Sequence, residues 1–399
     1  MIYYLGGLLK NFWGPARLFQ SYTVLIALAL YIGFFLSKVL IPKFYKYLPS
    51  DRGREFTLTK EVAKGKPTGS GVVFITIFVI LCFIIVPLDY LQSGILALTW
   101  LMMLTGFLDD RSLKGWGEYR KAFLDFVIAV AAAFLLMHYL SQTSPDGRLR
   151  FWFPFFSTTI HIPCWLYVAI TVIMLWMSVN TTNCTDGVDR LSSTLVLIAL
   201  LTMGALFYIV LGHVDISTYL LVPHLKDGAS WAIITFCLAG VLMGYLWHNA
   251  FPSSVLMGDA GSRALGFFIG VCVMVSGNPF LFLATSSIIF VNGGVGLLKV
   301  ALKRFFHISI FETVRFPLHD HMRKNKGWSP TQVLIKFMII QLLITVAMLG
   351  IFFKIRSGGK IKTAKNSVSF YLFKFMLQTC YQLQFLTSLR NCVKNQIES

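Results

Sequence analysis

The chain has 399 residues, of which 56% are hydrophobic and 13% are charged, whereas soluble domains have about 25% charged residues. This composition excludes a disordered, a fibrous and a soluble globular protein. The net charge of +18 would indicate nucleic acid binding in a soluble protein, but here the basic residues lie between apolar segments. We therefore expect membrane lipid headgroups or an anionic substrate as partners, and no nucleic acid.

About ten apolar segments are long enough to cross the hydrocarbon core of a membrane, which takes about 20 helical residues. They lie near residues 20–42, 70–88, 91–108, 123–141, 162–179, 191–212, 229–248, 263–277, 279–298 and 332–353. The sequence thus predicts an all-α polytopic membrane protein, with a transmembrane domain over residues 1–355. Residues 356–399 form a basic tail to which we assign no role.

The basic residues lie mainly in alternate loops. Loops after the odd-numbered spans hold about twenty Lys and Arg residues, and loops after the even-numbered spans hold about three. The positive-inside rule places the basic loops in the cytoplasm. Ten spans would leave both termini outside, where the basic tail fits poorly, so we expect an interfacial or poorly ordered tail rather than an eleventh span.

Five of the 17 acidic residues lie in three motifs, each where a predicted span meets a cytoplasmic loop. The motifs are Gly106-Phe107-Leu108-Asp109-Asp110, Asn183-Cys184-Thr185-Asp186-Gly187-Val188-Asp189 and Met257-Gly258-Asp259-Ala260-Gly261-Ser262. Each motif alone would be an ordinary turn or helix cap. Together the carboxylates would repel one another unless a cation neutralised them. Mg²⁺ fits best, because it binds through one or two carboxylates and phosphate oxygens.

Two other loops favour phosphate binding. His319 and His321 stand beside a basic run in the last long loop, which suits phosphate binding and proton handling. Zinc is the weaker interpretation, because no cysteine or third ligand is near them in the sequence. The segment with Lys64, Lys66 and Thr68 is rich in glycine but lacks the P-loop pattern, so we interpret it as a basic loop facing a phosphate rather than an NTPase site.

Carboxylates, histidines, lysines and glycines at the cytoplasmic ends of helices suit phosphoryl transfer from a nucleotide-linked substrate to a lipid phosphate. A carboxylate could remove the remaining proton of the lipid phosphate, or attack covalently itself.

In these motifs and their order the chain resembles the polyprenyl-phosphate N-acetylhexosamine-1-phosphate transferase superfamily, over about residues 20–355. The remaining matching pieces are Pro67-Thr68, Asn249 ten residues before Asp259, and Pro317-Leu318-His319 followed by Lys326-Gly327-Trp328. The Pro-Leu-His piece favours the muramoyl branch of the superfamily over the N-acetylglucosamine branch.

The resemblance implies a homodimeric, Mg²⁺-dependent enzyme of the bacterial inner membrane whose active site faces the cytoplasm. It implies transfer of phospho-MurNAc-pentapeptide from UDP-MurNAc-pentapeptide to undecaprenyl phosphate. The products would be lipid I and UMP, in the first membrane step of peptidoglycan synthesis.

The resemblance also implies residue roles. Asp109 and Asp110 match the paired aspartates, with Asp109 as the base for the lipid phosphate, and Asp259 matches the magnesium-binding aspartate. We expect metal ligands at Asp259, Asp110 and Asp186, and catalytic roles for Asp109, Asp110, Asp259, His319 and His321. We expect substrate contacts from Lys64, Lys66, Thr68, Lys121, Asn183, Asp186, Asp189 and Asn249. Of these, Asn249 matches an asparagine of the uridine-side pocket.

Four positions depart from the family pattern. Asp320 replaces the middle residue of a His-His-His motif, Arg190 stands where the family has Gly, and Arg263 stands where it usually has Leu. Leu256 occupies a position that is commonly Phe, which would offer uracil a stacking face. These departures concern the nucleoside pocket and the choice of sugar.

Two other functions fit parts of the sequence. An N-acetylglucosamine-1-phosphate transferase acting on UDP-GlcNAc would share the acidic motifs and differ mainly in the last loop. A cation-coupled transporter would also have about ten spans with acids. Against transport, the acids lie at helix ends rather than near the midplane, and no inverted repeat is evident.

Overall fold

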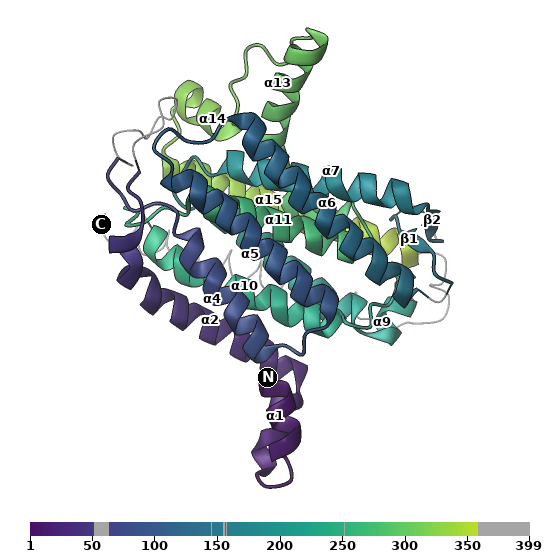
Figure 1. The fold of residues 1–399 in the computed structure, drawn as a ribbon. Coiled ribbons are helices and arrows are strands. Elements are labelled where there is room, and N and C mark those ends of the chain that lie inside the picture. Colours follow the sequence, from purple (N-terminus) through teal and green to yellow (C-terminus); the bar gives the residue numbers. More distant parts are fainter. Residues whose placement is uncertain (52–63, 145, 155, 157, 251, 358–399) are drawn as a thin grey trace, which may run out of the picture. The chain divides into compact units, whose positions relative to one another are not determined.

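The computed structural model describes residues 1–51, 64–144, 146–154, 156, 158–250 and 252–357. Nearly all regular structure in this part of the chain is helical (Figure 1). The longer helices are α2 (Tyr22–Phe44), α4 (Gly71–Ile85), α5 (Tyr90–Arg111), α6 (Glu118–Thr143), α7 (Cys164–Thr185), α8 (Leu191–Ala205), α10 (Gly228–Asn249), α11 (Gly258–Val275), α13 (Val295–Phe306) and α15 (Pro330–Ser357).

Short elements connect or extend these helices. They are α1 (Ile2–Leu9), α9 (Val214–Tyr219), α12 (Leu281–Ile289), α14 (Leu318–Lys326), the 3-10 helices η1 (Gly14–Gln20) and η2 (Tyr45–Tyr47), the π-helical turns η3 (Leu206–Leu211) and η4 (Phe290–Gly294), and the strands β1 (Leu149–Phe151) and β2 (Ile160–Ile162). The two strands pair antiparallel, with Arg150 opposite His161. The spans predicted near 191–212 and 279–298 therefore contain π-helical turns that the apolar pattern does not reveal.

Nine helices of the described residues are long and apolar enough to cross a membrane. The remaining predicted span, the second in chain order at 70–88, corresponds to α4, a shorter apolar helix of 15 residues. The all-α, polytopic membrane fold is thus confirmed. Residues 358–399, which make up nearly all of the predicted basic tail, lie outside the described residues, so the domain boundary at 355 stays a prediction.

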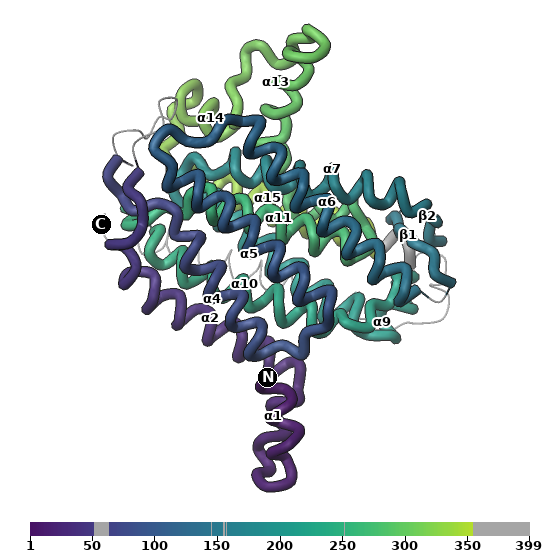
Figure 2. Tube along the Cα trace, viewed as in Figure 1, coloured from purple at the N-terminus to yellow at the C-terminus, as the bar shows by residue number. Residues whose placement is uncertain are grey.

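Helix α11 forms the centre of the bundle. Every residue from Gly258 to Val275 is buried, and α4, α5, α7 and α8 pack around it. Helix α10 packs mainly against α2 and α8. In Figure 2, α1 and α13 project from the bundle at its lower and upper margins. The central helix therefore presents its N-terminal turn, which carries Asp259, to several neighbours at once.

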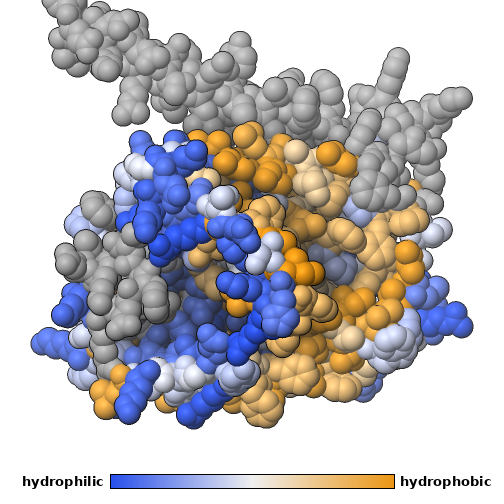
Figure 3. Space-filling view, turned by 90° about the horizontal axis from the view of Figure 1, so that it is seen from above, coloured by the Kyte–Doolittle hydropathy of each residue, from blue (hydrophilic) through white to orange (hydrophobic). Residues whose placement is uncertain are grey.

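The outer helices present apolar side chains outwards. Helix α15 exposes Ile339, Leu343 and Val346, and α2 exposes Tyr31, Phe35 and others. Figure 3, which views the molecule from above Figure 1, shows hydrophilic side chains gathered on one part of the visible face and hydrophobic ones over much of the rest. Such a surface is stable in lipid, where backbone groups satisfy one another within each helix. The structure and composition together describe a multi-pass membrane protein.

Two glycines let neighbouring helices approach the first turn of α11. A Cβ atom on Gly106 of α5 would lie 2.6 Å from the Asp259 carbonyl carbon and 2.7 Å from the Ala260 nitrogen. A Cβ atom on Gly71 of α4 would lie 2.5 Å from the Ala260 carbonyl carbon. Because these neighbours are backbone atoms, a larger residue would move a whole helix.

We expect Gly106→Ala to destabilise the protein by about 1–3 kcal/mol, since overpacking against backbone forces helices apart. The melting temperature of the purified protein in detergent measures this loss. Gly350→Ala is the matched control, because nothing lies within 4 Å of the Cβ position there and alanine favours a helix. Equal melting temperatures for the two variants would contradict the close packing.

Candidate functional site

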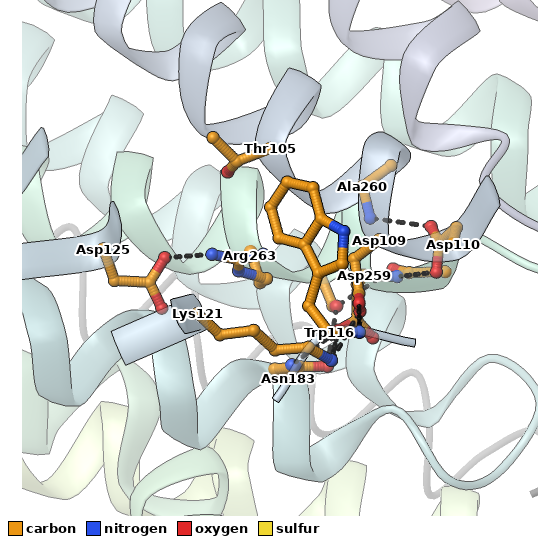
Figure 4. Close-up of polar contacts among 12 residues, drawn as sticks. Thr105, Asp109, Asp110, Trp116, Lys121, Asp125, Asn183, Asp259, Ala260 and Arg263 are labelled. Atoms are coloured by element: carbon orange, nitrogen blue, oxygen red, sulfur yellow. Dashed lines mark hydrogen bonds and ion pairs between the residues drawn. The ribbon is translucent and has the colours of Figure 1, made fainter. Parts of the chain in front are cut away.

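The first and third acidic motifs meet at one lysine. Asp109 ends α5, Asp259 begins α11, and Lys121 lies in the first turn of α6. The Lys121 ammonium lies 3.1 Å from Asp259 Oδ2 and is also ion-paired with Asp109 Oδ2 (Figure 4). Asp109 and Asp259 are 7% and 2% exposed. Two buried carboxylates from distant parts of the chain thus share one cation.

Neutral groups fix the orientation of both carboxylates. The Trp116 N–H donates to Asp109 Oδ1 at 2.6 Å, so the loop after α5 folds back over the helix end. Asn183 Nδ2 lies 3.5 Å from Asp259 Oδ2, and the Ser262 hydroxyl donates to Asn183 Oδ1 at 3.1 Å. The start of the second motif therefore joins the same cluster.

Asp110 binds the N-terminus of α11. Its Oδ1 and Oδ2 accept the backbone N–H groups of Asp259 and Ala260, each at 3.0 Å. A carboxylate here satisfies two donors that lack partners within the helix and complements the helix dipole. Asp110 thereby holds Asp259 in place, a role that the motif alone does not distinguish from metal binding.

The rest of the second motif faces a neighbouring loop. The Lys66 ammonium donates to Ser253 Oγ at 3.0 Å, and Ser253 Oγ donates to Asp189 Oδ2 at 2.9 Å. Asp186 follows α7 directly, and its N–H donates to the Asn183 carbonyl at 3.1 Å. These contacts bring Lys66 and Asp189 together through a hydroxyl group that the sequence did not single out.

Asn249 braces two loops with its amide group. Its Oδ1 accepts the Arg190 N–H at 2.8 Å, and its Nδ2 donates to the Val255 carbonyl at 2.8 Å. Arg190 has φ of 70°, a left-handed conformation that favours glycine. A glycine, which the resemblance implies at this position, would adopt this backbone without strain, and Arg190 adopts it with its N–H bonded to Asn249.

The basic loop is tied to the segment before Asp259. Thr68 N–H donates to the Pro49 carbonyl at 2.8 Å, and Leu256 N–H donates to the Pro67 carbonyl at 2.8 Å. Lys64 is exposed, while Lys66 and Thr68 are half-buried. The structure therefore places this loop beside the third motif, as expected for a loop that contributes to the same site.

The histidines form a separate group. The backbone N–H of His319 donates to Asn292 Oδ1 at 2.8 Å, and its ring Nδ1 lies 3.0 Å from Asn292 Nδ2. A Cβ on Gly187 would lie 2.9 Å from His319 Cε1, so the ring packs closely against the second motif. His321 Nδ1 accepts the Arg315 N–H at 3.3 Å.

The charges of this group follow from its surroundings. Burial, and next the positive charge of Arg323, lower the pKa of His319 to about 3, so the ring is neutral near pH 7. Burial raises the pKa of Asp320, against the opposing effect of Arg315 and Arg323. His319 is thus a buried, neutral ring held by Asn292, and the catalytic role expected for it stays a prediction.

Comparisons with known proteins identify the family of this chain. A family model described as glycosyl transferase family 4 matches residues 93–277. The phospho-N-acetylmuramoyl-pentapeptide-transferase of Treponema pallidum (strain Nichols) is 56% identical over 348 residues, which cover 87% of this chain and 95% of that protein. This chain belongs to the phospho-N-acetylmuramoyl-pentapeptide-transferase family.

Relatives of lower identity carry the same name. The phospho-N-acetylmuramoyl-pentapeptide-transferase of Helicobacter pylori (strain HPAG1) is 31% identical and covers 84% of this chain and 95% of its own length. That of Campylobacter jejuni (strain RM1221) is 30% identical, covering 83% and 95%. The resemblance predicted from the motifs, including the muramoyl branch, is confirmed. Membership in a transferase family favours an enzyme over the transporter alternative.

In this family member the expected site residues fall into three groups. The first is the cluster of Asp109, Asp110, Lys121, Asn183 and Asp259. The second lies on the adjoining loops and consists of Lys64, Lys66, Thr68, Asp186, Asp189 and Asn249. The third consists of His319 and His321, beyond Gly187. The sequence did not single out Trp116, Ser253, Asn292 or Asp125, and it marked Arg263 only as a departure from the family pattern. The Asp125–Arg263 ion pair carried one further signal, because its members follow Lys121 and Asp259 by four residues.

The charges of the first cluster suit a divalent cation. In the described part of the chain, no group of three or more His, Cys, Asp and Glu side chains stands ready to hold a metal. Yet Asp109 and Asp259 share one lysine, and Asp110 lies beside them at the N-terminus of α11, which leaves net negative charge. Mg²⁺ takes one or two carboxylates and completes its shell with water and phosphate oxygens, so Asp259 with a neighbouring carboxylate would fit such an ion when a phosphate substrate is present. The ligand set expected from the sequence, Asp259, Asp110 and Asp186, stays a prediction.

Replacing Asp110 with Asn tests its hold on α11. The amide of Asp110→Asn has one acceptor oxygen, so one of the two N–H groups would lose its partner. We expect the free energy of unfolding to fall by about 1–3 kcal/mol. Chemical denaturation in detergent measures this loss, and Glu312→Gln, at an exposed position, is the control. A variant as stable as the control would contradict the capping role.

Burial of His319 predicts a dependence of stability on pH. In the unfolded chain, His319 binds a proton below its ordinary pKa of 6.5. In the folded chain, its pKa is about 3, so the ring stays neutral until the pH falls to that value. The free energy of unfolding therefore falls as the pH decreases through this window. Melting temperatures between pH 7.5 and 4.5 should fall less steeply for His319→Gln than for the wild type.

The exposed His307 provides the control for this experiment. His307→Gln should keep the wild-type slope. An unchanged slope for His319→Gln would show that His319 takes up its proton in the folded state.

Proposed function

We propose that the protein is a Mg²⁺-dependent phosphoglycosyl transferase that moves phospho-MurNAc-pentapeptide from UDP-MurNAc-pentapeptide to undecaprenyl phosphate, giving lipid I and UMP. The observation that carries the proposal is the cluster in which Asp109 and Asp259 share the Lys121 ammonium at the ends of membrane-spanning helices. The names of the relatives support UDP-MurNAc-pentapeptide as the sugar nucleotide.

The residues of the cluster would divide the reaction between them. An oxygen of the lipid phosphate attacks the phosphorus that carries the sugar, and the bond from that phosphorus to UMP breaks. Asp109 would take the remaining proton of the lipid phosphate, while Lys121 offers positive charge to the phosphates. Mg²⁺, held by Asp259 and a second carboxylate, would neutralise the diphosphate and stabilise the departing UMP.

The loops would hold the nucleotide. Lys64 and Lys66 carry positive charge beside the third motif, and Asn249 fixes the backbone at Arg190 and Val255 that would border the uridine. Asp186 is part of the proposal as a metal ligand, since it follows Asn183 at the end of α7. The hydrogen bonds of Asn249 and Asp110 to backbone groups support an indirect role in the reaction, in which both side chains hold neighbouring segments of the site in place.

The membrane arrangement is part of the same proposal. The concentration of Lys and Arg in alternate loops supports a cytoplasm-facing site in the inner membrane, where UDP-linked precursors are available. The apolar outer helices support access for a polyprenyl chain from the bilayer. The family resemblance supports a homodimer.

A Mg²⁺-dependent assay of UMP release with undecaprenyl phosphate tests the function. We expect turnover with UDP-MurNAc-pentapeptide and none with UDP-GlcNAc. Asp259→Asn should lower kcat about 100-fold or more, because the buried carboxylate stabilises charge only in the assembled site. Asp215→Asn, at an exposed position of α9, should keep wild-type activity.

Two results would overturn parts of this proposal. Turnover of UDP-GlcNAc without turnover of UDP-MurNAc-pentapeptide would assign the enzyme to the N-acetylglucosamine branch. Full activity of Asp259→Asn would remove the metal role from that residue.

A further inference from the structure

A second ion pair lies one helical turn away from the Lys121–Asp259 contact. Arg263 of α11 and Asp125 of α6 form an ion pair through Nη2 and Oδ1, and they are only 1% and 2% exposed. Both belong to membrane-spanning helices, one turn further from the helix ends than Lys121 and Asp259 (Figure 4). A charged pair at such a position needs a physical reason.

Stability does not supply that reason. Removing two charges from water is unfavourable, and apolar replacements of a buried ion pair are often neutral or stabilising. The Arg263 guanidinium is also poorly satisfied, because its Nε and Nη1 have no hydrogen-bond partner among the described residues. A pair retained only for stability would have its remaining donors satisfied.

The two ion pairs, Lys121–Asp259 and Asp125–Arg263, lie next to each other with their charges in alternating order. Along α6, Lys121 is followed four residues later by Asp125, and along α11, Asp259 is followed four residues later by Arg263. Residues at this spacing lie on the same helix face, one turn apart. Each charge therefore has an opposite charge along its own helix and another across the helix pair.

The ion pairs are the main links between these two helices. Helix α6 packs chiefly against α7 and α5, and it touches α11 over few residues. Both helices pack against α5 and α7, so apolar packing sets the position of α6 relative to α11 mainly through those two neighbours. The Lys121–Asp259 and Asp125–Arg263 contacts join the two helices directly.

We propose that Asp125 and Arg263 are positioning residues that hold Lys121 against Asp259 and Asp109. This inference rests on the proposed function, since it assigns the pair to the geometry of that reaction. The Asp125–Arg263 contact fixes the helices one turn away, and its charges attract Lys121 and Asp259 along each helix. A displacement of about 1 Å in such a group can lower a rate about 100-fold.

The decisive variant removes both charges at once. Arg263→Leu and Asp125→Asn each leave one buried charge unpaired, so both should lower kcat and the melting temperature. The double variant Asp125→Leu/Arg263→Leu should restore the melting temperature to the wild-type value or above. Its kcat should stay about tenfold or more below wild type, with the KM for the sugar nucleotide changed much less.

Arg150→Leu is the matched control, because Arg150 pairs with Asp146 in the loop between α6 and α7. It should keep wild-type kcat. Wild-type kcat in the double variant would overturn the proposal, since Asp125 and Arg263 would then do no more than neutralise each other.

A second measurement follows Lys121 without using activity. An amine-reactive reagent, quantified by mass spectrometry of peptides, should modify Lys121 severalfold faster in Arg263→Leu and in the double variant than in the wild type. The exposed Lys64 serves as the reference within each protein. Unchanged labelling of Lys121 in both variants would also overturn the positioning role. If the wild type releases no UMP from either sugar nucleotide, the proposed function fails, and labelling alone decides the positioning role.

Discussion

The sharing of one lysine ammonium by two buried carboxylates is the interaction on which the candidate site depends. Asp109 and Asp259 are both buried, and a buried charge is costly unless an opposite charge lies beside it. Lys121 supplies it, and the helix N-terminus stabilises Asp110 beside them. The arrangement leaves surplus negative charge, which is the condition for recruiting a divalent cation together with a phosphate substrate.

Close packing around the first turn of α11 makes this sharing possible. Gly106 and Gly71 allow α5 and α4 to approach the backbone of α11, so Asp109 and Asp110 at the end of α5 meet Asp259 at the start of α11. Asn183 reaches the cluster from α7, and Lys121 reaches it from α6. Four helices thereby converge on one turn, and a shift in any of them would change the distances between the charged groups.

The departures from the family pattern have structural explanations at two positions. Arg190 adopts the left-handed backbone that a glycine would adopt, with Asn249 accepting its N–H. Arg263 is balanced by Asp125 rather than exposed to lipid. At Asp320, burial raises the pKa of the carboxyl group beside a neutral histidine. At Leu256, the backbone N–H and carbonyl pair with the basic loop, and these contacts do not explain the choice of side chain.

The sequence by itself determined the membrane fold, the positions of the spans and the acidic motifs, because hydropathy and the scarcity of charge are local properties. It also indicated the family through the order of those motifs. Only the tertiary structure decided which carboxylate caps α11, which two share Lys121, and that Asp125 and Arg263 form a pair. These contacts join residues up to about 150 positions apart, and their formation depends on helix packing that no local pattern encodes.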